Sequence, residues 1–298
     1  MAASQAENTK RAYEHSWNVF TEWCIGAGKN PMPASPETAR LFVSWCLSAK
    51  KYRLETVRTH LSGIKSRHLK RREPSPIDDS VRALVKSAAR RLREKPGGKL
   101  ALTPQQLRKI CEATAQEGTA LAIRDRALLL VGFAGAFRRS DLSALHIQDV
   151  RFVKEGVAVS IWKTKTDQTG QGRLIGIPPG EANVTCPVGA LKAWIQLRGE
   201  TPGRLFKRVY PSGRVAEKGG ITGESVNETI KRWLSKIGVD GADFGAHSLR
   251  AGFVTAAGDA GASHITIMRR TGHRSVQTVM RYLRPTQAFA SNPLAGVL

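Results

Sequence analysis

The chain has 298 residues, and 47 Lys and Arg against 24 Asp and Glu give it a formal net charge of +23. Its length fits two domains, and an apolar fraction of 41% is enough for buried cores and too high for a disordered chain. The sequence shows no apolar run of membrane-spanning length and no secretory signal, and its four cysteines (Cys24, Cys46, Cys111 and Cys186) form no C-x-x-C pair, so we expect a reduced, cytoplasmic protein without a disulfide scaffold or a cysteine-rich zinc site.

Four helices are predicted in the first hundred residues. Apolar side chains recur at helical spacing over residues 6–27, and Ser35-Pro36-Glu37 supplies a cap, a first-turn proline and a first-turn acid for a second helix. A third helix is expected over 54–69 and a fourth over 78–93. Together these elements predict a small helical bundle.

A linker is predicted at residues 95–99, where the sequence KPGGK follows the bundle. We therefore expect a helical domain over 1–98 and a second domain over 99–298. In the second domain, helices are predicted over 103–117, 121–137, 187–199, 223–237, 247–260, 263–270 and 275–284, and strands over 147–153, 157–166 and 173–177. Three glycines are expected to end helices: Gly238, Gly261 and Gly272. The predicted fold class is mainly α with a small antiparallel β-sheet.

The end of the bundle is strongly basic. Residues 50–95 hold 15 Lys and Arg against 5 Asp and Glu. Because phosphate neutralisation supplies most non-specific affinity for DNA, this stretch predicts a surface that follows a DNA backbone, and the alternative is a merely solvated helix face. An anionic membrane fits less well, since the charge forms no single amphipathic tail. The residues assigned to the DNA surface are Lys65, Arg67, Lys70, Arg71, Arg72, Arg90 and Arg91.

Several polar residues of the second domain could carry chemistry. Arg138 ends an apolar helical run, where it needs either an anion or a partner such as Asp141, three residues on. Lys163 and Lys165 lie at the tip of a predicted hairpin, where a lysine is either solvated or able to reach into a groove as a cation or proton donor.

A third group lies near the C-terminal end. His247 and Arg250 are three residues apart and share a helix face, and Gly272-His273 and Tyr282 follow. Taken singly, each of these residues has an ordinary structural explanation. Their order and spacing do not look accidental.

Arg, a hairpin Lys, His-x-x-Arg, Gly-His and then Tyr together resemble the tyrosine recombinase (phage integrase) family, in its Cre-like branch. The resemblance covers the whole chain and is most specific in HSLRAGFVTAAGDAGASHITIMRRTGHRSVQTVMRYLRP. The segment AFRRSDLSAL resembles the first-arginine motif of the family, with Arg138 at the catalytic position and Asp141 where the family usually has Glu.

The resemblance implies a site-specific DNA recombinase that cuts and rejoins duplex DNA through a 3′-phosphotyrosine intermediate, with strand exchange via a Holliday junction. It implies no metal and no other cofactor, because arginine and lysine side chains neutralise the phosphate charge. The roles it assigns are nucleophile for Tyr282, phosphate clamp for Arg138 and Arg250, phosphate hydrogen bond for His273, general base for His247, support for Asp141, and general acid for Lys165 with Lys163 as second choice.

The same resemblance implies double-stranded DNA with an inverted-repeat target and a homo-oligomer on that DNA, a tetramer of two dimers. It suggests that the charge-free tail, residues 286–298, joins neighbouring subunits, and that the gene is bacterial, phage-borne or plasmid-borne. Three alternatives remain open: a type IB topoisomerase, a DNA-binding regulator that does not cleave, and a metal nuclease using His247, His264 and His273.

Overall fold

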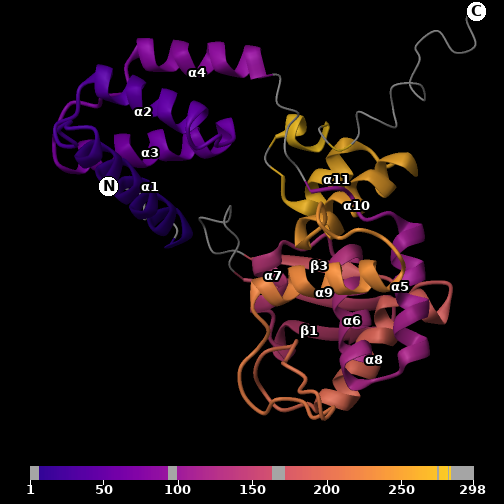
Figure 1. Cartoon of the computed structure of the whole chain (residues 1–298). Coiled ribbons are helices and arrows are strands. Elements are labelled where there is room, and N and C mark those ends of the chain that lie inside the picture. Colours follow the sequence, from indigo (N-terminus) through magenta and orange to yellow (C-terminus); the bar gives the residue numbers. More distant parts are fainter. Residues whose placement is uncertain (1–6, 93–98, 163–171, 274, 281, 283–298) are drawn as a thin grey trace, which may run out of the picture. The chain divides into compact units, whose positions relative to one another are not determined.

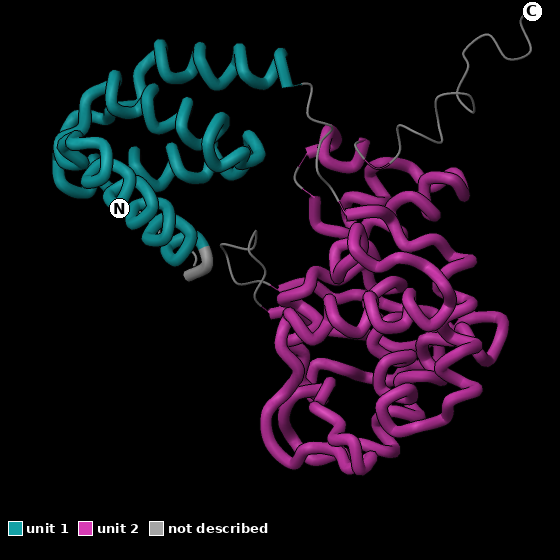
Figure 2. Tube along the Cα trace, viewed as in Figure 1, with its two compact units in different colours: residues 1–97 teal, residues 98–298 magenta. Residues whose placement is uncertain are grey.

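The computed structural model describes the chain except for residues 1–6, 93–98, 163–171, 274, 281 and 283–298. It divides into two compact units, Met1–Gly97 and Gly98–Leu298 (Figure 2). Among the described residues, no helix is long and apolar enough to cross a membrane.

In the described part of the first unit, four helices (Figure 1) surround one apolar core. They are α1 (Glu7–Gly26), α2 (Pro36–Ser48), α3 (Leu54–Lys70) and α4 (Asp79–Leu92), as the sequence predicts. The hydroxyl of Ser35 accepts a hydrogen bond from the backbone N–H of Thr38 and so caps α2. Phe20, Phe42 and Ile64 are fully buried where α1, α2 and α3 meet.

The second unit surrounds a three-stranded antiparallel sheet with helices. The helices are α5 (Pro104–Glu117), α6 (Ala120–Ala134), α7 (Arg139–Ala144), α8 (Pro187–Arg198), α9 (Gly223–Lys236), α10 (Ala246–Asp259) and α11 (His264–Thr271). The strands β1 (Val150–Val153), β2 (Gly156–Ile161) and β3 (Arg173–Ile177) pair in chain order. Residues 276–280, inside the last expected helix, are also helical. The fold is mainly helical with a small antiparallel sheet, as predicted.

Three predicted elements have clearly different bounds in the structure. The helix expected over 121–137 ends at Ala134, because Ala136 takes a left-handed conformation (φ 50°) and turns the chain into α7, which was not predicted. The strand expected from residue 147 begins at Val150, after a short 3-10 turn over Ile147–Asp149. The strand predicted from residue 157 begins at Gly156 and ends at Ile161. The three cap glycines all have positive φ just after helices, as expected.

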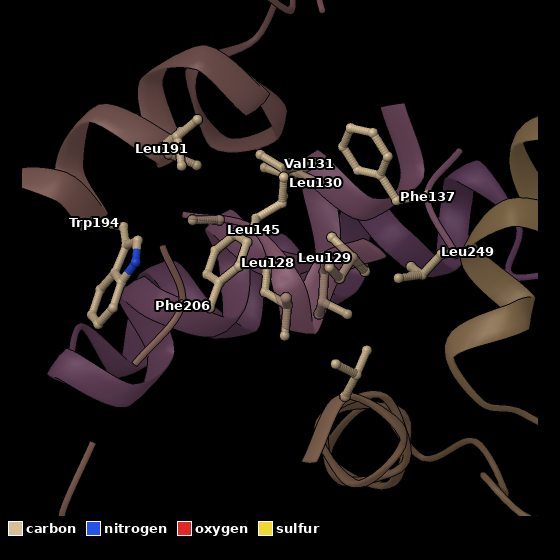
Figure 3. Packing of buried hydrophobic residues seen from close by; sticks show 14 of the residues in the cluster. Leu128, Leu129, Leu130, Val131, Phe137, Leu145, Leu191, Trp194, Phe206 and Leu249 are labelled. Carbon is tan, nitrogen blue, oxygen red and sulfur yellow. The ribbon is translucent and has the colours of Figure 1, made fainter. Parts of the chain in front are cut away.

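Helix α6 lies at the centre of the second core, as Figure 3 shows through its Leu128, Leu129 and Val131 side chains. Its C-terminal part, residues 127–134, is apolar on all sides, a pattern typical of a helix that is surrounded by others. A Cβ added to Gly132 would lie 2.8 Å from Leu249 of α10 and 3.0 Å from Leu142 of α7. Gly132 therefore lets both helices pack closely against α6, and these are the helices that position Arg250 and Arg138.

A buried carboxylate fixes α9 to α6. Asp125 is fully buried and accepts hydrogen bonds from Arg124 (2.5 Å), Arg232 (2.5 Å) and the indole N–H of Trp233 (2.8 Å). Two guanidinium groups and an indole donor compensate for the cost of burying its charge.

Candidate active site

Arg138 lies in the turn between α6 and α7. Its backbone N–H donates to Oδ2 of Asp141 (3.1 Å), so this carboxylate caps α7, and no ion pair between the two side chains occurs in the described structure. Nη2 of Arg138 instead donates to the carbonyl oxygen of Gly272 (3.4 Å). Nη1 is buried and has no hydrogen-bond partner among the described residues. The alternative in which Arg138 simply pairs with Asp141 is therefore wrong.

Arg250 is the most buried cation of the site, with 1% of its surface exposed. Nη1 donates to the carbonyl oxygen of Ala136 (2.8 Å) and Nη2 to that of Thr271 (2.5 Å). Burial, together with the charges of Arg138 and Arg173, lowers its pKa to about 10, so it remains charged at neutral pH. Through these bonds Arg250 connects α10 to the turn before Arg138 and to the end of α11.

His273 is held in one tautomer. The Thr271 hydroxyl donates to the carbonyl oxygen of Ile267 (2.7 Å), so it accepts from Nδ1–H of His273 (2.8 Å). This assignment, made from the hydrogen-bond network, leaves Nε2 to accept from Nη2 of Arg250 (3.0 Å). Burial and the charges of Arg250 and Arg138 lower the His273 pKa to about 4. The ring is therefore neutral at physiological pH.

Tyr282 is placed against both histidines. Its hydroxyl lies 2.5 Å from Nε2 of His247, and its ring lies over that of His273 with centroids 6.3 Å apart. Its apolar body packs against a small cluster that includes Val254 and Ile267. Burial and the charges of Arg250 and Arg138 lower the His247 pKa, which favours the neutral ring that can accept a proton from the phenol.

Arg173 is a further cation of the site that the sequence analysis missed. It is the first residue of β3, and its side chain lies so close to Gly272 that a Cβ there would overlap Nη1. Burial lowers the Arg173 pKa, Asp141 raises it, and Arg138 lowers it. An arginine after a glycine-rich turn gives no signal in so basic a sequence. The tautomer-setting role of Thr271 was also missed, although its position beside Gly272-His273 was a local clue.

Not every predicted residue can be placed. Lys163 and Lys165, the two candidate acids, lie outside the described residues, as does the tail 286–298. His264 begins α11, and within the described part of the chain no group of three His, Cys, Asp or Glu side chains could hold a metal ion.

The predicted DNA-binding residues of the first unit are all exposed, and they lie on α3, its C-terminal turn and the end of α4. Arg67 lies over the ring of Trp17, 5.6 Å from its centroid. The described ion pairs include none of the predicted DNA-binding residues, which are Lys65, Arg67, Lys70, Arg71, Arg72, Arg90 and Arg91. Their positive charge is available to a polyanion, and their contact with DNA stays a prediction.

The second unit thus brings cations and a phenol together from separate segments. Arg250 and the two histidines lie close to Tyr282. Arg138 and Arg173 add positive charge close to Arg250 and His273, and the carboxylate of Asp141 interacts with Arg173 and Arg250. Guanidinium groups neutralise the charge that collects on a phosphate under attack, and a neutral imidazole can take the phenol proton. This arrangement suits nucleophilic attack by a tyrosine on a phosphodiester.

Comparison with known proteins gives consistent matches. The model of the phage integrase family matches residues 101–288. The chain is 33% identical over 297 residues to the integrase/recombinase xerD homolog of Selenomonas ruminantium, covering 98% of this chain and 85% of that protein. It is 23% identical over 296 residues to the recombinase cre of Escherichia phage P1, covering 91% and 84%. The fold resembles the Tn1549 transposon integrase solved with transposon right end DNA, with TM-score 0.68, 15% identity, and 94% and 90% of the two chains covered.

Proposed function

Because this chain belongs to the phage integrase family and is a tyrosine site-specific DNA recombinase, we propose that Tyr282 is its nucleophile and that His247 is the base that activates it. The observation that carries the proposal is the 2.5 Å contact between the Tyr282 hydroxyl and Nε2 of His247, beside the buried guanidinium of Arg250. A phenol has an unperturbed pKa near 10, so it needs both a neighbouring base and a cationic site to lose its proton.

The reaction exchanges one phosphate ester for another. The oxygen of Tyr282 attacks the phosphorus as His247 takes the phenol proton, and the bond from phosphorus to the 5′ oxygen breaks. The leaving oxygen receives a proton from a general acid, for which Lys165 is our first choice and Lys163 the second. The products are a 3′-phosphotyrosine and a free 5′-hydroxyl. The same steps run in reverse when another 5′-hydroxyl attacks, so the ester energy is conserved and strands can be exchanged.

Arg138 and Arg250 stabilise the charge that develops on the non-bridging oxygens. His273 contributes a hydrogen bond to the same phosphate. Because Nε2 of His273 accepts from Arg250 in the DNA-free structure, this bond requires a proton on Nε2 once phosphate is bound. Asp141 supports Arg138 by holding the backbone turn from which its side chain projects.

Double-stranded DNA is the partner that the charge and the relatives support. The Tn1549 integrase of similar fold was solved in complex with DNA, and the exposed basic surface of α3 supplies the charge for backbone contacts in this chain. In this proposal the first unit binds DNA, the second unit cuts it, and a tetramer of two dimers assembles on inverted repeats. The tail 286–298 then joins neighbouring subunits.

Covalent trapping tests the nucleophile. Inverted repeats in the DNA that flanks the gene supply candidate sites, each built with a nick that lets the cleaved strand diffuse away. Wild type should form a protein–DNA adduct that survives denaturing electrophoresis, and Tyr282→Phe should bind the same DNA without forming it. Tyr210→Phe, in the same unit but outside the site, is the matched control. A persisting adduct in Tyr282→Phe would remove this residue from the mechanism.

A further inference from the structure

Two guanidinium groups of the active site have hydrogen-bond donors that the described protein does not use. Nη1 of Arg138 is buried without a partner, and so are Nε and Nη2 of Arg173. A buried N–H group without a partner costs roughly 1–3 kcal/mol, more when it carries charge, so natural structures rarely keep one without a reason. Arg250, by contrast, donates to two backbone carbonyls.

The two arginines that carry these unused donors both contact the turn at Gly272. Arg138 donates to the carbonyl oxygen of Gly272, and the Arg173 guanidinium packs against the Cα of the same residue. Gly272 has φ +66° and directly precedes His273, so only glycine gives both this backbone conformation and the space that Arg173 occupies. Arg173 is thereby placed in the same electrostatic neighbourhood as Arg250 and His273.

The positive charge of Arg138, Arg173 and Arg250 is not balanced by nearby carboxylates within the described structure. Three arginines face one carboxylate, Asp141, which already accepts hydrogen bonds from the backbone of Arg138 and from the hydroxyl of Ser140 (3.4 Å). No ion pair of Arg173 with an acidic side chain occurs among the described residues. An anion with several acceptor oxygens would satisfy these donors and compensate the charge.

We propose that Arg173 is a third guanidinium of the phosphate clamp, binding the non-bridging oxygens of the scissile phosphate together with Arg138. The proposal rests on the cleavage function assigned above. It places a phosphate-binding residue at the start of β3, shortly after the candidate acids in the sequence. The clamp then holds the phosphate from the sheet as well as from α7 and α10.

Stability without DNA separates this role from a structural one. Arg173→Met removes a buried charge and unpaired donors while keeping an unbranched side chain. If the role of Arg173 is to bind an anion, the melting temperature of the DNA-free variant should stay the same or rise. A residue that holds the Gly272 turn in place would instead lower the melting temperature when replaced. Arg151→Met, at an exposed position of strand β1, is the matched control.

Cleavage of a neutralised substrate tests the contact itself. On normal nicked DNA, Arg173→Met should form the covalent adduct about 100-fold more slowly than wild type, the scale of losing one preorganised donor to a reacting phosphate. On DNA with a methylphosphonate at the scissile position, the difference from wild type should shrink below about tenfold, since a neutral centre leaves less charge to compensate. Arg173→Lys should recover part of the normal rate, because it keeps the charge but not the two-pronged geometry.

Equal losses on the normal and the neutral substrate would overturn the proposal, and so would rescue by a methylphosphonate at a flanking phosphate only. Unchanged cleavage by Arg173→Met would also overturn it while leaving the role of Tyr282 intact. Absence of an adduct with wild type on every candidate site would refute the cleavage function and this inference with it.

Discussion

The histidine beside Arg250 should make the stability of the DNA-free protein depend on pH in a defined direction. Burial and neighbouring arginines lower the pKa of His273 from 6.5 to about 4, so the unfolded chain binds a proton in the pH range between these values and the folded chain does not. The contribution of neutral His273 is therefore fully present above pH 6.5 and is lost as the pH falls towards 4. A shift of about 2.5 units corresponds to an upper bound of about 3 kcal/mol, reduced by solvent screening because the ring is partly exposed.

Urea unfolding of wild type and His273→Gln between pH 4.5 and 8 measures this contribution. Above pH 7 the free energies of unfolding of wild type and His273→Gln should change with pH in the same way. On going to pH 4.5, the free energy of unfolding of wild type should fall by about 1–3 kcal/mol more than that of the variant. His264→Gln, at the start of the preceding helix α11, should keep the wild-type slope. A direct check is the imidazole ¹⁵N shift of His273, which should show a neutral ring down to about pH 5. A normal titration near pH 6.5, or equal slopes for wild type and His273→Gln, would refute the buried cationic environment described here.

Other parts of the structure give further predictions. Gly252→Ala places a Cβ on the carbonyl oxygen of Leu102, so it should lower the free energy of unfolding by about 1–3 kcal/mol and slow cleavage, as measured by urea unfolding and covalent trapping. Asp125→Asn leaves the buried guanidinium of Arg124 and the partly exposed one of Arg232 without a carboxylate and should cost about 3–5 kcal/mol by the same unfolding assay. Replacing both Arg71 and Arg72 by Ser should reduce the slope of log affinity against log salt by about 2, and an unchanged slope would mean that this face does not contact phosphates.

The helices could be predicted because their signals are local. The periodic apolar residues, the Ser35 cap and the glycines after α9, α10 and α11 all act within one or two turns of chain. The break between α6 and α7 could not be predicted in this way. The apolar run continues through Phe137, and what ends the helix is the left-handed turn at Ala136, whose carbonyl oxygen accepts from Arg250. That contact joins residues far apart in sequence.

The residues of the candidate site also fall into those that the sequence could identify and those that only the fold brings into place. Arg138, His247, Arg250, His273 and Tyr282 were found because their residue types and order resemble a family motif, and the structure brings all five together. Arg173 was missed because its place in the site depends on β3 lying beside the end of α11. No spacing rule within a single sequence expresses that proximity.

The hydrogen bonds of the three arginines indicate different roles for Arg250 and for the other two. Arg250 donates to main-chain carbonyls on both sides of the site, so its removal would leave those acceptors unpaired and disturb the turns before Arg138 and His273. Arg138 and Arg173 hold the donors that remain unused in the described structure. Loss of Arg250 should therefore lower stability and cleavage together, whereas loss of Arg173 should lower cleavage alone. A site in which Arg250 has its hydrogen bonds, while Arg138 and Arg173 keep buried donors for an anion, is preorganised for the charge that develops in the transition state.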